Sequence, residues 1–289
     1  MNKYLISADI EGITGVVTRE FSREQGKYHA LACRYMASDV NAVIQGIVEM
    51  DPEAIIIVRD AHGSAVNLNL ELLHSAAQLI QGWDAQQNML FGLNKDFTGV
   101  FLIGYHAGGD NPDAVLAHTM SSVIREIKIN GEPVNETGLL ALYAGQLGIP
   151  VVMVSGDDFA IAEAVQQLGN NIVTVAVKKS YGRSCSSSIS LEAAKNQLRK
   201  GATEAIVRLR QNIFSPKIVT GRVKCELSLY GIGVGTLIIR NISQLFAHDA
   251  SYAFNLQSGS IIFESEEIGE ILQRISLILF TIYGIRSMS

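Results

Sequence analysis

The chain has 289 residues, with 23 lysines and arginines against 28 aspartates and glutamates, and a formal net charge of -5. A chain of this length can bury a large core, as one large α/β domain or as two smaller ones. Its basic residues are scattered and form no positive stripe, which argues against nucleic acid as a partner.

The three cysteines, Cys33, Cys185 and Cys225, show no paired spacing, which argues against a disulfide framework and against a zinc ribbon. Every apolar run is shorter than the ~18 residues that a membrane span needs, so no membrane partner is expected. The N-terminus enters a strand pattern directly and shows no signal-peptide pattern. We therefore expect free thiols, a reducing compartment and cytoplasmic localisation.

Strand patterns alternate with amphipathic helix patterns through the first two thirds of the chain. Strands are predicted at 3–9, 54–62, 99–108, 151–158 and 171–177, and helices at 28–49, 136–147, 158–168 and 191–212. These strands are too rich in Val, Ile and Leu to have one face in water, which favours a mainly parallel sheet flanked by helices. The predicted fold class is α/β.

The pattern changes after NIFSPKI at 212–218, where a helix pattern ends and Ser-Pro favours a turn. Strands are then predicted at 217–231, 236–242, 252–257 and 260–267, followed by a helix at 266–282. We therefore predict an α/β domain that carries the functional site over residues 1–213, and a smaller α+β region over residues 214–289.

The first predicted strand ends in two carboxylates separated by one residue, in SADIEGITG. Alternate strand side chains point to the same face, so Asp9 and Glu11 can reach one point. Carboxylates beside an apolar core are costly unless positive charge pairs with them. The next two strands end in RDAHG, with His62, and GYHAGG, with His106. The carboxyl ends of parallel strands meet at one edge of the sheet, so these side chains are expected to converge.

Glu136, at the start of the helix pattern in NETGLLALYAG, offers a further carboxylate. Carboxylates and imidazoles together suit zinc, manganese or a similar divalent ion. Five such ligands exceed the needs of one tetrahedral ion, which predicts two ions sharing a bridging carboxylate. Each residue alone also fits a simpler role, as a solvated strand end, a histidine bound to a carbonyl or an acid at a helix start. Their joint placement at three strand ends favours the metal site.

Three other residues have alternative interpretations. His118, in AVLAHTMSS, is either a general acid/base or oxyanion stabiliser over the metals, or a structural histidine. Asp60 either orients the His62 imidazole or is a polar loop residue. Cys185 has no identifiable partner base and is not expected to be a nucleophile. No phosphate-binding glycine loop follows the first strand, so no nucleotide cofactor is expected.

The motifs SADIEGITG, RDAHG, GYHAG, AHTM and NETGLLALYAG occur in an order that resembles the D-aminopeptidase family of metallopeptidases. The likeness extends through VVMVSGDD and AVKKSYGRS and is loose in the C-terminal part. It implies a binuclear zinc aminopeptidase that acts on short peptides with an N-terminal D-residue. It also implies zinc ligands at Asp9, Glu11, His62, His106 and Glu136, and a catalytic histidine at His118. A large ring-shaped homo-oligomer, often a decamer, is implied as well.

The predicted reaction is metal-assisted amide hydrolysis, in which His118 stabilises the tetrahedral oxyanion or protonates the leaving amine. Two alternatives remain open. One is a binuclear hydrolase of another amide or of a phosphoester, because the same ion pair serves both chemistries. The other is a non-enzymatic metal- or peptide-binding protein with structural ions, which would need a closed coordination sphere.

Overall fold

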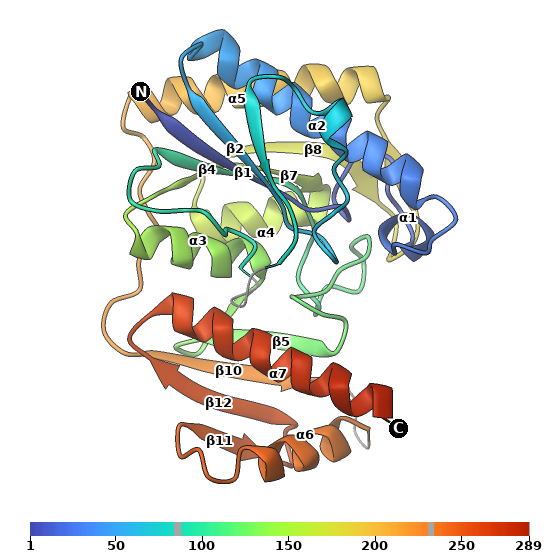
Figure 1. Cartoon of the computed structure of the whole chain (residues 1–289), viewed down its shortest axis with the longest axis vertical. Helices are drawn as coiled ribbons and strands as arrows, with labels where there is room; N and C mark the ends of the chain where they lie inside the picture. Colours follow the sequence, from blue (N-terminus) through green and yellow to red (C-terminus); the bar gives the residue numbers. More distant parts are fainter. Residues whose placement is uncertain (84–87, 231–233, 289) are drawn as a thin grey trace.

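The computed structural model describes residues 1–83, 88–230 and 234–288, arranged as two packed bodies, each built on one β-sheet (Figure 1). The larger body contains a 7-stranded sheet in the order β3-β2-β1-β4-β7-β8-β9. Its strands are β1 (Lys3–Ala8), β2 (Ile55–Asp60), β3 (Ala77–Ile80), β4 (Gly99–Tyr105), β7 (Val151–Asp157), β8 (Val173–Ser180) and β9 (Ser186–Ser188). Neighbouring strands are parallel except β8 and β9. The predicted α/β class with a mainly parallel sheet is confirmed.

Helices cover both faces of this sheet, α2 and α5 on one side and α3 and α4 on the other (Figure 1). The helices of the larger body are α1 (Arg19–Ser22), α2 (His29–Met50), the 3-10 helix η1 (Leu70–Leu72), α3 (Glu136–Gln146), α4 (Asp158–Leu168) and α5 (Leu191–Arg210). The side chains of successive residues in β1 point to opposite faces of the sheet. Ile6 packs in the core with α2 and α5, and Leu5 in the core with α3.

The smaller body contains a 5-stranded antiparallel sheet in the order β11-β12-β10-β5-β6. Its elements are β5 (Ile124–Ile129), β6 (Glu132–Val134), β10 (Val223–Leu229), α6 (Val234–Leu245), β11 (Tyr252–Asn255), β12 (Ser260–Ser265) and α7 (Ile268–Met288). The β5–β6 hairpin lies far upstream in the sequence, yet β5 pairs with β10. The division of the chain at residue 213 stays a prediction, and residues 124–134 join the later strands in one sheet.

The strand predicted at 236–242 is wrong, because these residues lie in α6. Ile238, Ile239 and Ile242 are buried, whereas Arg240 is exposed. Burial at positions three and four apart is the pattern of one helix face. A short apolar run fits a strand or a buried helix equally well by periodicity, which explains the error.

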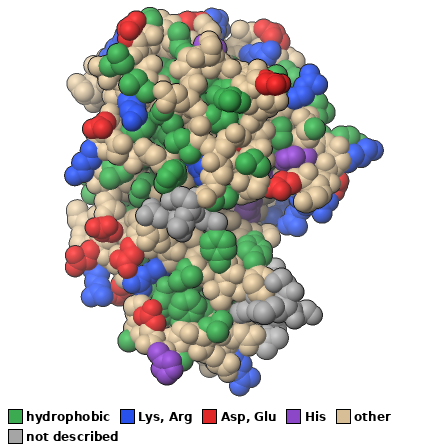
Figure 2. Space-filling view, in the orientation of Figure 1, with side chains coloured by type: hydrophobic (Ala, Val, Ile, Leu, Met, Phe, Trp, Pro, Cys, Tyr) green, Lys and Arg blue, Asp and Glu red, His purple; other side chains and the backbone are tan. Residues whose placement is uncertain are grey.

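Helix α7 lies along the boundary between the two bodies and packs against α3, β10 and β12 (Figure 1). One of its faces is buried in the core through isoleucines spaced three or four residues apart: Ile268, Ile271, Ile275, Ile278 and Ile282. Beside α7, Figure 2 shows the surface hollowed between the two bodies, with hydrophobic side chains along its lower border. Among the described residues, no helix combines the length and the apolar character that crossing a membrane requires.

Candidate metal centre

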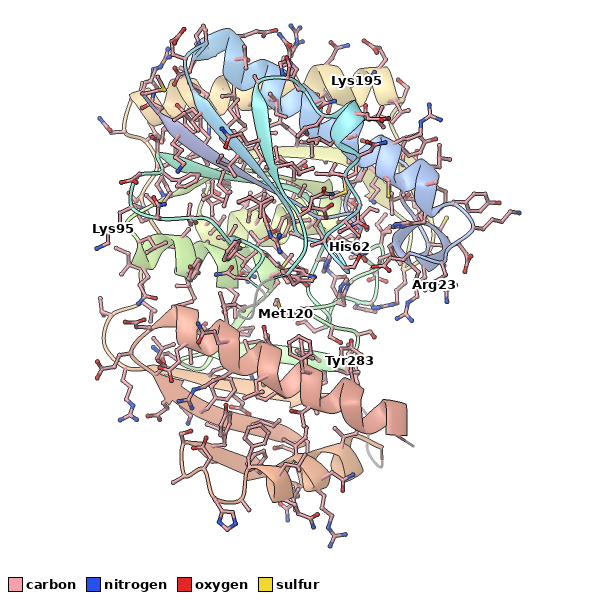
Figure 3. All side chains as sticks on the ribbon, in the orientation of Figure 1. Arg23, His62, Lys95, Met120, Lys195 and Tyr283 are labelled. Atoms are coloured by element: carbon pink, nitrogen blue, oxygen red, sulfur yellow. The ribbon has the colours of Figure 1, made fainter. Side chains whose placement is uncertain are left out.

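Asp9, His62 and His106 follow three neighbouring parallel strands, β1, β2 and β4. The amide of Asp9 still donates to the carbonyl of Ile103 at 2.9 Å, so the ladder between β1 and β4 continues to the first carboxylate. The loops that follow leave the sheet at its carboxyl edge, where parallel sheets form their sites. His62 lies at this edge, facing the boundary with the smaller body (Figure 3).

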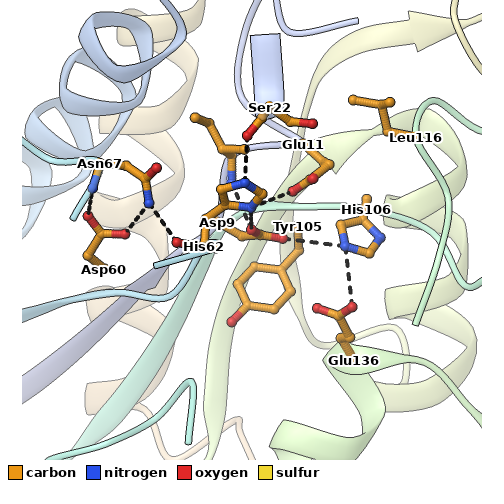
Figure 4. Close-up of polar contacts among 12 residues, drawn as sticks. Asp9, Glu11, Ser22, Asp60, His62, Asn67, Tyr105, His106, Leu116 and Glu136 are labelled. Carbon is orange, nitrogen blue, oxygen red and sulfur yellow. Dashed lines mark hydrogen bonds and ion pairs between the residues drawn. The ribbon is translucent and has the colours of Figure 1, made fainter. Parts of the chain in front are cut away.

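The carboxylate of Asp9 lies between two histidines (Figure 4). Its Oδ1 is 3.0 Å from Nδ1 of His62, and its Oδ2 is 3.4 Å from Nε2 of His106. Glu11 Oε2 lies 3.0 Å from the same His62 nitrogen. Glu136 Oε1 lies 3.4 Å from the same His106 nitrogen. The side chains therefore form two ligand-type groups that have Asp9 in common.

His118 lies beside the second group. One of its ring nitrogens lies within 4.8 Å of ligand-type atoms of His106 and Glu136, which are themselves within that distance of each other. Its ring stacks on that of His106. The structure thus brings together all the candidate site residues, and their roles as metal ligands or catalyst stay predictions.

Each of the three imidazoles presents one nitrogen to a backbone carbonyl. The pairs are His62 Nε2 with Ser22 at 2.8 Å, His106 Nδ1 with Ala107 at 3.0 Å, and His118 Nδ1 with Leu116 at 2.8 Å. Donation to these carbonyls leaves the other nitrogen of each neutral ring with its lone pair free. Metal-binding histidines are oriented in this way.

The donor set fits a divalent cation such as zinc. Asp9, Glu11 and Glu136 are at most 5% exposed, and buried carboxylates are costly without positive charge nearby. Glu11 Oε2 and His106 Nε2 are buried and make no hydrogen bond of acceptable geometry to the described residues. A cation at each of the two groups would satisfy these atoms and would offset the negative charge.

The crowded carboxylates shift the pKa values of the cluster. Burial and the charge of Glu11 raise the pKa of Asp9 to about 7, against the opposing effect of His62. Burial favours a lower pKa for His106, but Glu136 and Asp9 raise this pKa to about 10. Burial, and then the charge of His106, lowers the pKa of His118. Without a bound cation, the carboxylates therefore favour the protonated form of His106, and His118 favours the neutral form. A cation at His106 Nε2 would take the place of that proton.

Lys178, on β8, holds the loop that carries Glu11. Its Nζ donates to the carbonyls of Glu11 at 2.5 Å, Ile13 at 3.1 Å and Val16 at 2.6 Å. The side chain is buried, and this burial lowers its pKa to about 8. Lys178 was not expected to have a role from the sequence. The available signal was a lysine inside an apolar strand, where a charged group needs several partners.

The segment that carries His118 is held in a strained conformation. Leu116 and Met120 have left-handed backbone angles, with φ of 53° and 60°. This region costs a non-glycine residue about 1 to 2 kcal/mol. Arg183 fixes the segment, because its carbonyl accepts from the amide of Leu116 at 3.0 Å and its guanidinium donates to the carbonyl of Ala117 at 2.7 Å. The position of His118 is therefore imposed by the surrounding chain.

The carboxylate of Asp60 binds the loop after His62 and not its imidazole (Figure 4). It accepts from the amides of Asn67 at 2.6 Å and Leu68 at 2.7 Å. The Asn67 side chain also donates to Asp60 at 2.8 Å and to the carbonyl of His62 at 2.7 Å. Asp60 thus shapes the loop, and the carbonyl of Ser22 orients the ring.

The cluster opens into two cavities. The polar cavity, of about 540 Å³, includes Arg19, Arg23 and Arg183 in its lining. The apolar cavity, of about 430 Å³, lies between the cluster and α7 and is lined in part by Trp83, Met89, Met120, Leu279, Phe280 and Tyr283. Both cavities share His62, Gly63 and His118, so the cluster lies where they meet.

A family model described as D-aminopeptidase matches residues 2–235 of the chain. The chain belongs to the D-aminopeptidase family. The resemblance inferred from the sequence motifs is therefore confirmed, and the matched range includes every candidate residue of the metal centre.

Two members of the D-aminopeptidase family provide the comparison. A D-aminopeptidase of Bacillus subtilis (strain 168) is 36% identical over 187 residues, which are 63% of this chain and 65% of that protein. This match spans just under two thirds of the relative's length. A solved structure, described as the Zn-dependent D-aminopeptidase DppA from Bacillus subtilis, a self-compartmentalizing protease, matches with a TM-score of 0.89 at 26% identity. It covers 97% of this chain and 98% of that chain, so the two share one fold over nearly their whole length.

Proposed function

We propose that this member of the D-aminopeptidase family is a metal-dependent aminopeptidase that removes the N-terminal residue of short peptides and prefers a D-residue there. The observation that carries the proposal is the buried Asp9 carboxylate, which has one oxygen near His62 and the other near His106. The descriptions of the Bacillus subtilis proteins as D-aminopeptidases, one of them Zn-dependent, support the substrate class and the metal.

We assign two zinc ions to the cluster. Asp9, Glu11 and His62 would hold one ion, and Asp9, His106 and Glu136 would hold the other. Bound there, the ions would supply Lewis-acid activation of the scissile carbonyl and of a water molecule. Glu11 Oε2 and His106 Nε2 support this assignment, because each is a buried ligand-type atom without a hydrogen bond to the described residues, which a cation would satisfy.

His118 is the proposed proton-transfer group. Its Nδ1 donates to the carbonyl of Leu116, so Nε2 of the neutral ring carries a free lone pair. The lowered pKa favours this neutral form. In this state the ring can take a proton from the attacking water and give it to the departing amine. Stabilisation of an oxyanion would require an N–H at Nε2 from the start, so proton transfer is the favoured role.

We further propose that the chain forms a homo-oligomer, with a decamer as the size that the family resemblance implies. The description of DppA as self-compartmentalizing supports an assembly, because this chain matches that structure over 97% of its length. Light scattering coupled to size-exclusion chromatography measures the mass directly. A monomer at micromolar concentration would contradict this part of the proposal.

The deciding experiment combines metal analysis with a substrate panel. We expect about two zinc ions per chain and chelator-sensitive release from the D-Ala p-nitroanilide in preference to the L-Ala compound. Asp9→Asn should lose zinc and activity, and Glu53→Gln, at an exposed carboxylate, should keep both. Cleavage of a phosphoester in place of the anilides would reassign the substrate. Bound zinc with no hydrolysis would favour a binding protein, and failure to bind zinc would overturn the metal centre.

A further inference from the structure

Helix α7 turns a second face toward the metal centre, separate from its buried isoleucine face. Ser276, Leu279, Phe280 and Tyr283 recur at three- and four-residue intervals, and all line the apolar cavity. Phe280 is 50% exposed and Tyr283 is 49% exposed. The other wall of the same cavity includes Asp9, His62, His118 and Glu136. This face of α7 therefore lies across the cavity from the proposed reaction centre, with Tyr283 on the α7 side and His62 on the other (Figure 3).

The walls of the apolar cavity are held by specific contacts. The indole N–H of Trp83 donates to the carbonyl of Gly63 at 2.5 Å, and the Arg59 guanidinium lies 4.4 Å from the centre of the indole ring. On the α7 side, the hydroxyls of Tyr283 and Ser121 are 2.6 Å apart. The cavity thus has a preformed shape, as small-molecule sites usually have.

The two cavities differ in the chemistry of their linings. The lining of the polar cavity contains three arginines against two glutamates, an excess of positive charge that suits a carboxylate: Arg19, Arg23 and Arg183 with Glu11 and Glu24. The apolar cavity has no lysine or arginine among the described residues that line it. A short peptide that lies across the cluster therefore finds positive charge on one side and apolar surface on the other. Its C-terminal carboxylate matches the first side, which directs its N-terminal residue to the second.

We infer that the apolar cavity receives the side chain of the substrate's N-terminal residue, and that Leu279 and Phe280 set a preference for large apolar side chains. The inference rests on the proposed aminopeptidase function and adds its substrate class. In this orientation the scissile bond lies at the cluster, between the two cavities. A leucine-sized side chain would remove apolar surface of α7 from water, which an alanine side chain would do far less.

The test compares kcat/KM for D-Leu-Gly and D-Ala-Gly with the zinc-loaded enzyme. We expect D-Leu-Gly to be favoured by about tenfold or more, the scale on which an apolar pocket distinguishes side chains of different length. Phe280→Ala should abolish most of this preference, and the half-exposed position makes folding of this variant safe. Leu277→Ala is the matched control, because Leu277 is 47% exposed on α7 and lies outside the cavity lining. No preference for D-Leu-Gly, or an equal preference in Phe280→Ala, would overturn the inference.

A binding measurement separates failure of this inference from failure of the proposed function. If neither dipeptide is hydrolysed, the proposed function fails. The cavity is then tested by calorimetric binding of D-leucinamide and D-alaninamide to the zinc-loaded protein. Tighter binding of D-leucinamide that Phe280→Ala removes and Leu277→Ala preserves would support the assignment of the cavity. Equal binding of the two amides to the unmodified chain would overturn it.

Discussion

The imidazole rings of His106 and His118 lie face to face, with ring centroids 3.9 Å apart and ring planes 14° apart. Two stacked imidazoles repel each other when both are protonated. Without a bound cation, the carboxylates around His106 favour the charge on that ring, so its neighbour His118 is the ring kept neutral. A cation at His106 would likewise place positive charge on that side of the pair. The two histidines therefore have different proposed roles. His106 faces the carboxylates as a metal ligand, and His118 is free to accept a proton.

Replacement of His118 by alanine tests this division. His118→Ala should keep its zinc, because the proposed ligands are unchanged, and should lower kcat by roughly 100-fold or more. The measurement is kcat with D-Ala p-nitroanilide together with zinc per chain. His248→Ala, at an exposed histidine of the smaller body, serves as the control. Unchanged kcat would remove His118 from the mechanism, and loss of zinc would make it a ligand.

Because Lys178 holds the loop that carries Glu11, its replacement should reduce both the stability of the protein and its zinc content. Lys178→Met should lower the free energy of unfolding by about 3 kcal/mol, because carbonyls of Glu11, Ile13 and Val16 lose a buried donor. Zinc content should fall as well, since the loop that carries Glu11 is released. Lys179→Met, at the next and exposed position, should change stability by less than about 0.5 kcal/mol. The free energy of unfolding in urea and the zinc content are measured for both variants. Equal stabilities of the two variants would show that Lys178 does not hold the loop.

Alanine variants of two glycines distinguish the cost of a left-handed backbone from the cost of displacing Asp9. Gly104 and Gly148 have φ of 76° and 82°. A Cβ added at Gly104 would overlap the carbonyl oxygen of Asp9 and the side chain of Ile13, whereas one at Gly148 would meet no atom within 4 Å. Both alanine variants should lose about 1 kcal/mol of stability from the left-handed backbone.

Only Gly104→Ala should also lose further stability and zinc, because it displaces Asp9. Thermal unfolding and zinc content are the measurements for this glycine pair. Equal losses in the two variants would show that the approach of Gly104 to Asp9 has no consequence for the site.

The buried carboxylate of Asp39 should make the free energy of unfolding depend on pH. Burial raises its pKa to about 6, although hydrogen bonds from the amide and hydroxyl of Thr14 oppose this shift. The unfolded chain therefore loses the proton first, between about pH 4 and 6, while the folded chain keeps it. Stability should fall as pH rises through this window, by about 3 kcal/mol from this residue.

Asp39→Asn should remove this contribution, and Asp96→Asn, at an exposed carboxylate, should not. Denaturant midpoints across the window provide the measurement. An unaltered pH slope in Asp39→Asn would contradict the assignment.

The parts of the site that follow strand ends could be predicted from the sequence. Apolar runs marked β1, β2 and β4, and parallel pairing sends the ends of such strands to one edge of the sheet. Asp9, His62 and His106 therefore converge as expected. The expectation of convergence required only local patterns and one rule of sheet topology. The order of the strands was not predicted, and it is the adjacency of β2, β1 and β4 that brings the three side chains within reach of one another.

Other parts depend on contacts between distant segments and could not be predicted. The face of α7 that carries Phe280 and Tyr283 reaches the cluster because β10 pairs with β5 and β12, and no local pattern specifies those partners. The β5 segment IREIKI was not predicted as a strand. Lys178 was missed because its carbonyl partners lie more than 160 residues away in sequence.

The β5–β6 hairpin occupies the chain between two residues of the cluster, since His118 precedes it and Glu136 follows it directly. The hairpin nevertheless belongs to the sheet of the smaller body. A rotation of that body would therefore pull on both segments at once. The smaller body therefore cannot be exchanged for another domain by cutting the chain at a single linker. Any domain put in its place would have to keep the distance between His118 and Glu136.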